Sequence, residues 1–183
     1  DVMSQRRLNK FGINESFEQP ADYGQSLIQN QLMGIDVMHQ EGFKGDGLLI
    51  GVLDAGFFNA DKLSVFDSLF KNNRILYTYD FVKKETSVYE DHTHGTQVLS
   101  CLAGYLKGKL IGPAYRANYI LFRTEDVATE TKKEEIYWLI AAERADSAGV
   151  DIITSSLGYT TFDKSSDNYK TSQLDGNTAL ITK

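Results

Sequence analysis

An unbroken apolar run at residues 48–53, followed by Asp54, constrains the fold of this chain more than any other feature. The run has no polar face, which is typical of a strand that is buried on both sides in a parallel sheet. Two residues after Asp54, Gly56 gives the chain a position at which it can turn away sharply. Because parallel strands are joined by crossovers that are usually helical, the run predicts a chain in which strands and helices alternate.

The remaining segments supply that alternation. Three further strands are expected, at residues 74–81, 117–122 and 151–154. Helices are expected at residues 25–40 with a break at Gly34, 62–71, 96–106 and 133–147. This order predicts an α/β fold with a doubly wound parallel sheet and right-handed crossovers.

The clearest amphipathic helix, at residues 133–147, is expected to turn one apolar face toward the sheet. That face consists of Ile136, Leu139, Ile140 and Ala145. The polar residues 1–23 are predicted to form an exposed N-terminal arm. Residues 24–183 contain no repeat, low-complexity tract or linker, so they are expected to belong to one domain.

Composition excludes several classes of protein. The 19 basic and 25 acidic residues give a net charge of −6, so no basic field attracts nucleic acid. No segment approaches the roughly 20 apolar residues of a membrane span. Cys101 is the only cysteine, which excludes an internal disulfide and a cysteine-based metal cage. The first residues show neither a starting methionine nor a signal-peptide pattern, and we expect a mature or trimmed chain.

Two polar segments contain candidate functional residues, one directly after a predicted strand and the other directly before a predicted helix. Asp54 lies at the carboxyl end of a strand, where open α/β sheets bind ligands. It is equally consistent with an ordinary strand-end residue or a phosphoacceptor. His94 precedes Gly95 at a helix entry, which suits a general base whose carboxylate partner comes from another strand end. Together with His92 it could instead form a metal pair, which would need a third ligand.

A third segment, residues 153–158, reads ITSSLG and opens a strand end into small, accessible residues. An ordinary strand–loop transition has the same appearance. Taken in order, however, the three segments resemble motifs of the subtilase family of serine proteases. The aspartate motif is similar to residues 50–56 (IGVLDAG), and the histidine motif is similar to residues 94–98 (HGTQV), with Gln97 in place of a second histidine. Residues 111–114 (IGPA) resemble a reordered family turn, and residues 155–158 (SSLG) resemble its substrate segment.

The resemblance covers about residues 28–183 and implies a role for each matched residue. Asp54 would orient and support His94, and His94 would take the proton of a serine hydroxyl and return it to the leaving amine. Ser156, Leu157 and Gly158 would line the S1 pocket beside an extended peptide. The implied partner is a protein or peptide substrate, no cofactor is required for catalysis, and no calcium site is assigned. The implied location is secreted or in the cell envelope.

The serine of that triad is not recognisable in this chain. In subtilisin it follows the histidine by roughly 150 residues, and the oxyanion asparagine follows by roughly 90, so both positions would fall beyond Lys183. We therefore expect a subtilisin-like sheet truncated at its C-terminal side, with the other half of the domain as a partner and no activity in this chain alone. Two other functions remain open: a non-catalytic peptide-binding module, and a metal- or phosphate-binding domain that uses Asp54, Asp91, His92 and His94.

Overall fold

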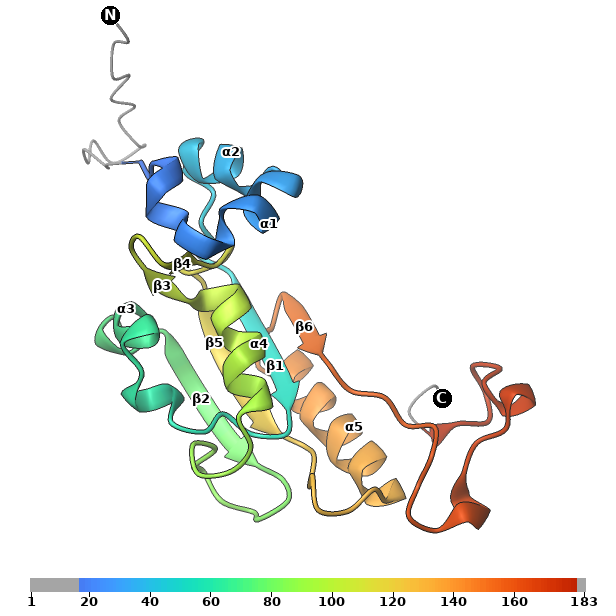
Figure 1. Cartoon of the computed structure of the whole chain (residues 1–183). Helices are drawn as coiled ribbons and strands as arrows, with labels where there is room; N and C mark the ends of the chain where they lie inside the picture. The colour runs from blue at the N-terminus through green and yellow to red at the C-terminus, as the bar shows by residue number, and fades with distance from the viewer. Residues whose placement is uncertain (1–16, 181–183) are drawn as a thin grey trace, which may run out of the picture.

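A four-stranded parallel sheet forms the centre of the molecule in a computed structural model, which describes residues 17–180 (Figure 1). The strand order is β2-β5-β1-β6, and a separate antiparallel hairpin pairs β3 with β4. The strands are β1 (Leu49–Asp54), β2 (Ile75–Asp80), β3 (Tyr105–Leu106), β4 (Leu110–Ile111), β5 (Asn118–Arg123) and β6 (Ile152–Ser155). All neighbours in the larger sheet run parallel, which confirms the predicted α/β class.

Helices cover both faces of that sheet. The α-helices are α1 (Leu27–Leu32), α2 (Ile35–Gln40), α3 (Asp67–Lys71), α4 (His94–Ala103) and α5 (Lys132–Ser147). Short 3₁₀ turns are η1 (Pro20–Ser26), η2 (Ala60–Lys62), η3 (Ser64–Phe66), η4 (Ser165–Asp167) and η5 (Thr171–Gln173). Gly34 adopts a left-handed conformation between α1 and α2, as the predicted break requires. None of the helices between residues 17 and 180 has the length and apolar character that a bilayer span needs.

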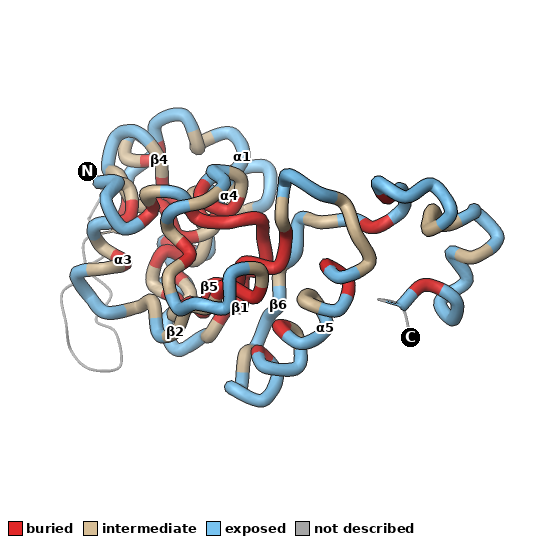
Figure 2. The backbone as a smooth tube through the Cα atoms, turned by 90° about the horizontal axis from the view of Figure 1, so that it is seen from below, coloured by how far each residue is buried: buried red, intermediate tan, exposed pale blue. Residues whose placement is uncertain are grey.

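Two hydrophobic clusters lie on opposite sides of the sheet. Val52 of β1 and Leu121 of β5 pack with Leu99 of α4 on one side. Leu53 of β1 and Phe122 of β5 pack with α5 on the other. Consecutive residues of one strand therefore serve opposite layers, which explains why the run at residues 48–53 has no polar face. Figure 2 shows the buried positions gathered along β1 and β5.

The predicted helix at residues 96–106 ends three residues early. Its last residues leave α4 and pair in the β3–β4 hairpin instead. The chain leaves the helix at Gly104, where an added Cβ would lie 2.4 Å from the Leu110 side chain and 2.5 Å from the Ser100 carbonyl oxygen. The hairpin folds back against the end of α4 at this position, so the chain must leave the helix there.

The predicted inner face of α5 is only partly correct. Ala145 is buried, but Ile136, Leu139 and Ile140 are 45%, 41% and 44% exposed. The helix packs on the sheet through buried Ala141 and Ala145, with Tyr137 and Trp138 partly buried beside them, because small side chains allow a close approach to the strand beneath. An added Cβ on Gly51 would lie only 3.5 Å from the Ala145 Cβ.

The predicted N-terminal arm falls mostly on residues 1–16, which lie outside the described residues. Its last part, residues 17–23, packs against the domain through Glu18 and Tyr23, while residues 19–21 are exposed. Glu18 forms an ion pair with buried Lys44 at 3.2 Å, and Tyr23 is 1% exposed. The Tyr23 hydroxyl lies 2.7 Å from Nδ1 of His39, so this segment is tied to α2.

Candidate active site

Asp54 is the last residue of β1, and the sheet buries it completely. Its Oδ1 accepts a hydrogen bond of 2.7 Å from the Ala55 N–H. Both neighbouring strands of the sheet pair with β1 close to this end, at Arg123 of β5 and Ser155 of β6. The carboxylate is therefore fixed at the carboxyl edge of the sheet, where β1, β2 and β5 all end (Figure 1).

His94 is the first residue of α4, and the loop before it reaches the same edge of the sheet. Two glycines bring the backbones of the two segments together. An added Cβ on Gly95 would lie 2.4 Å from the Gly56 carbonyl oxygen and 2.9 Å from the Asp54 Cβ. An added Cβ on Gly56 would lie 2.8 Å from the His92 nitrogen. Since no other residue fits at either position, glycine is what allows the two side chains to meet.

The Nδ1 atom of His94 lies 2.8 Å from Oδ1 of Asp54. This contact confirms the prediction that the two side chains lie within hydrogen-bonding reach across the carboxyl end of the sheet. The side chain of His94 is 42% exposed while that of Asp54 is fully buried. A histidine bound to a carboxylate through Nδ1 presents Nε2 for proton transfer, which is the arrangement of a general base.

The charged form of the Asp54 carboxyl group is disfavoured by its burial. Burial raises the pKa of this group above its ordinary value, although the hydrogen bonds from His94 and the Ala55 N–H act in the opposite direction. Its Oδ2 atom is buried and has no hydrogen-bond partner among the described residues. An unpaired oxygen of this kind destabilises the fold, and such costs are usual where a group is held for chemistry.

His92, a candidate metal ligand, and Gln97, which replaces the family's second histidine, both lie on the surface. His92 is exposed, and its Nδ1 accepts a 3.3 Å hydrogen bond from the His94 backbone N–H. Its ring stacks beside that of His94 at 6.5 Å. Gln97 is exposed on α4. Among residues 17–180, no three His, Cys, Asp or Glu side chains are gathered so that they could hold a metal ion.

The predicted substrate segment lies at the same edge of the sheet. Ser155, the last residue of β6, pairs with Leu53, the residue before Asp54, and Ser156 follows directly. Ser156 and Gly158 are exposed and Leu157 is half-buried. The segment is thus open to a ligand, but it makes no hydrogen bond with His94 within the described part of the chain.

Two polar residues near this segment were missed by the sequence reasoning. Buried Tyr159 donates a hydrogen bond from its hydroxyl to Oε1 of Glu125, which follows β5. Burial raises the pKa of the Glu125 carboxyl, against the hydrogen bonds from Tyr159 and Thr124. Together these residues anchor the end of the segment. The available signal was a run of polar residues, 123–126, directly after an apolar strand.

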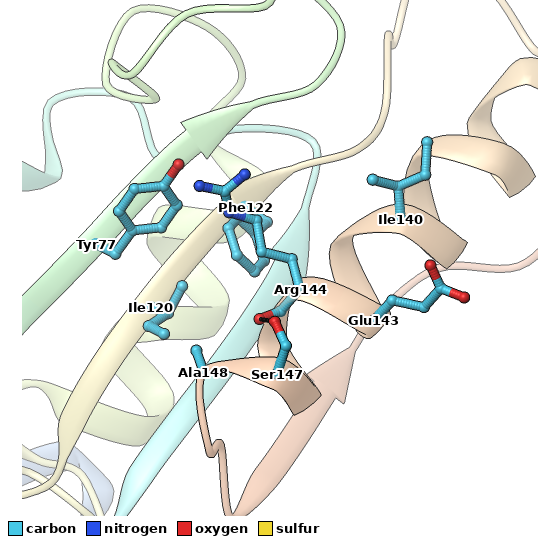
Figure 3. A pocket seen from close by; sticks show the side chains of 8 residues that line it. All are labelled: Tyr77, Ile120, Phe122, Ile140, Glu143, Arg144, Ser147 and Ala148. Atoms are coloured by element: carbon cyan, nitrogen blue, oxygen red, sulfur yellow. Dashed lines mark hydrogen bonds between the residues drawn. The ribbon is translucent and has the colours of Figure 1, made fainter.

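A hollow of about 670 Å³ lies elsewhere, between α5 and the sheet (Figure 3). Tyr77, Ile120 and Phe122 line it from the strands, and Ile140 and Arg144 line it from α5. The Arg144 guanidinium lies 4.7 Å from the centre of the Tyr77 ring. Neither Asp54 nor His94 lines this hollow, so it is separate from the candidate active site.

Comparison with known proteins agrees with the geometry. The model described as "Subtilase family" matches residues 45–181. Among solved structures, the chain is similar to the MycP3 protease of the type VII (ESX-3) secretion system, with a TM-score of 0.57 and 19% identity over 78% of this chain and 39% of that one. MycP1 from Mycobacterium smegmatis gives a TM-score of 0.54 and 19% identity, with 76% of this chain and 36% of that one covered.

A third similar structure is fervidolysin from Fervidobacterium pennivorans, a keratinolytic enzyme related to subtilisin. Its TM-score is 0.52 and its identity 17%, with 81% of this chain and 23% of that one covered. The chain therefore spans well under half the length of these three proteins. No curated protein is similar enough to count as a match. At these identities the structural likenesses establish the fold.

Proposed function

This chain belongs to the subtilase family, and on that premise we propose that it supplies the aspartate and the histidine of a serine endopeptidase. The observation that carries the proposal is the 2.8 Å contact between His94 Nδ1 and the buried Asp54 carboxylate. It joins the two family motifs that the sequence places 40 residues apart.

In the proposed mechanism, Asp54 keeps the proton of His94 on Nδ1 and orients the ring. Nε2 then takes the proton of the serine hydroxyl as the serine oxygen attacks the carbonyl carbon of the scissile peptide bond. His94 returns that proton to the leaving amine when the carbon–nitrogen bond breaks. The negative carboxylate stabilises the imidazolium that exists between these two steps. The chemistry requires no cofactor.

The nucleophilic serine is proposed to come from residues outside the sequence given, either in the same longer chain or in a second chain. Two observations support this. The Ser155 hydroxyl accepts a 2.8 Å hydrogen bond from the Trp138 indole, and this contact does not involve a general base. No serine hydroxyl among residues 17–180 is hydrogen-bonded to His94. We therefore propose that this chain alone has no specific peptidase activity.

We assign the substrate side of the site to Ser156, Leu157 and Gly158. Their exposure at the edge that holds His94 suits an extended peptide paired through backbone groups. The proposed substrate is a protein or peptide. A secreted or cell-envelope location is supported by the fold shared with MycP3, a protease of a secretion system.

An active-site fluorophosphonate tests the proposal, because it labels only a serine that a neighbouring base activates. The chain alone should remain unlabelled, while a protein extended by the next two hundred residues should take up one equivalent. A matched His94→Ala variant of the extended protein should lose the label. Stoichiometric labelling of any serine in the chain alone would show that the nucleophile has been misassigned. An extended protein that binds peptides but takes up no label would favour the non-catalytic binding module instead.

A further inference from the structure

Arg123, the last residue of β5, places a buried positive charge directly beside the Asp54–His94 pair. Its side chain is 5% exposed, and in the sheet it pairs with Asp54 itself. A guanidinium in such a position must find partners for its five N–H groups, because an unpaired buried charge is strongly destabilising. The identity of those partners shows what the residue connects.

The first partners lie on the segments that end at the sheet edge. The Arg123 Nε donates to the Ala55 carbonyl oxygen at 3.2 Å, one residue after Asp54, and to the Glu125 carbonyl oxygen at 3.1 Å. Its Nη1 donates to Oδ2 of Asp80, at the end of β2, at 2.9 Å. The other Asp80 oxygen accepts hydrogen bonds from the backbone of Val82 and Lys83. Arg123 thus fixes the ends of β1 and β2 relative to β5.

The second kind of partner lies on the loop that delivers His94. Asp91 precedes His94 by three residues, and its Oδ2 lies 3.2 Å from Arg123 Nη1, an ion-pair distance although the two atoms form no hydrogen bond. The Asp91 side chain is 14% exposed, and its other oxygen pairs with Lys83 at 2.8 Å. The loop is also bonded to the segment after Asp54, since the Phe58 N–H donates to the His92 carbonyl oxygen at 3.1 Å. One guanidinium therefore contacts both chain segments whose side chains form the pair.

We propose that Arg123 is a positioning residue, which holds the Asp54 strand end and the Asp91–His94 loop at the separation that the Asp54–His94 hydrogen bond requires. The proposal rests on the proposed function for its importance to catalysis, but the geometry it explains is independent of peptidase activity. Arg123 touches neither reacting atoms nor, within the described residues, the His94 ring. It acts through the two segments that it joins.

The shape of the arginine side chain is what the role needs. A planar guanidinium offers donors in several fixed directions at once, and here Nε and Nη1 serve different segments. A lysine would keep the charge as a single point and could not reproduce this set of contacts. Displacement of a catalytic group by about 1 Å can lower turnover by ~10²-fold. A loss of this order in turnover, with the Michaelis constant nearly unchanged, is expected in the longer protease.

The experiment measures the His94 ring directly, by ¹⁵N NMR of the labelled chain. A bond to Asp54 selects the tautomer that carries its proton on Nδ1. In Arg123→Lys and in Asp91→Ala, the ratio of the Nδ1–H to the Nε2–H tautomer of His94 should fall by roughly tenfold or more, the equivalent of a lost hydrogen bond to a charged group. The matched control is Asp67→Ala, which removes an exposed ion pair with Lys71 and should leave the ratio unchanged.

The outcomes separate this proposal from the proposed function. An unchanged ratio in folded Arg123→Lys or in Asp91→Ala would overturn the positioning role. If Arg123→Lys does not fold, Asp91→Ala decides the question, since that residue lies in a loop and keeps part of its side chain in water. Asp54→Asn provides the other arm. If it too left the ratio unchanged, the Asp–His pair itself would be absent and the proposed function would fail; a changed ratio in Asp54→Asn alone would leave that function standing and remove only the role of Arg123.

Discussion

His39 and His94 show two different ways in which this fold uses an imidazole ring. His39 is 0% exposed, and both of its ring nitrogens are bonded, Nδ1 to the Tyr23 hydroxyl at 2.7 Å and Nε2 to the Pro113 carbonyl oxygen at 2.9 Å. His94 is bonded at Nδ1 only, and 42% of its side chain faces solvent. A ring with both nitrogens occupied can hold segments together, whereas a ring with one nitrogen available can exchange a proton with a substrate.

The groups that surround the two rings also differ. His39 lies between the rings of Tyr23 and Tyr115, at 5.8 Å and 5.4 Å, so its nearest neighbours are aromatic rings. His94 lies against a carboxylate whose burial is unfavourable. His39 ties buried segments together, whereas His94 offsets part of the cost of burying the Asp54 carboxylate. The contrast can be tested by measuring both turnover and the free energy of unfolding for variants of each histidine.

The largest expected effect is on turnover in the longer protease. His94→Ala should lower turnover by about 10⁶-fold, nearly as much as loss of the serine, and Asp54→Ala by about 10⁴-fold, because serine and base act as a unit. His39→Ala should leave the turnover of the folded fraction within a few fold. Hydrolysis of a protein substrate, normalised to folded protein by thermal melts, provides the measurement. Equal losses in the His39 and His94 variants would remove the distinction between the two rings.

Stability should respond in the reverse order. His39→Ala should lower the free energy of unfolding by about 3 kcal/mol, since it opens a cavity and leaves the buried Tyr23 hydroxyl without its partner. His94→Ala should lower it by about 1–2 kcal/mol, because the ring is half-exposed and the main loss is the hydrogen bond to the buried Asp54 carboxylate. Urea unfolding of the two variants side by side measures both values. A larger loss for His94 than for His39 would contradict the contrast.

Asp54→Asn should raise the free energy of unfolding at pH 7. The sign follows from the pKa, which burial holds above its value in the unfolded chain. The protonated carboxyl is favoured by the fold, so its contribution to stability is present at low pH and is lost as the pH rises through the folded pKa. The advantage of the variant should therefore be largest at neutral pH and shrink on acidification. Melting curves from pH 3 to pH 8 measure it, and an advantage that grew toward low pH would reverse the assignment.

The smallest expected effects belong to the third histidine. His92 is exposed and bonds only the backbone of its neighbour, so His92→Ala should change the free energy of unfolding by less than about 0.5 kcal/mol. Turnover in the longer protease should fall far less than in His94→Ala. If His92→Ala abolished turnover and His94→Ala did not, the register of the histidine motif would be wrong.

The sequence predicted the contact between Asp54 and His94 because each residue carries a local signal. Asp54 ends an apolar strand and His94 heads a helix, and each is followed within two residues by a glycine. The partners of His39 and Arg123 carry no such signal. Pro113 lies 74 residues from His39, and Asp80 lies 43 residues from Arg123, so only the folded chain reveals these contacts. The prediction of the inner face of α5 was partly wrong for a related reason. The buried positions, Ala141 and Ala145, depend on how closely the helix packs on the sheet, which apolar character alone does not indicate.

The close approach at Gly56 and Gly95 also determines how this protein tolerates change. The Asp54 and His94 side chains project from two backbones that touch, so either side chain can be shortened while the framework beneath it stays in place. A methyl group at one of the glycines, by contrast, would separate the frameworks while every reactive group remained present. Preparation of a folded, inactive form for binding work should therefore alter the aspartate or the histidine. A relative in which one of these glycines is replaced would still contain the aspartate and the histidine in its sequence. Its two side chains would, however, lie too far apart to form the hydrogen bond.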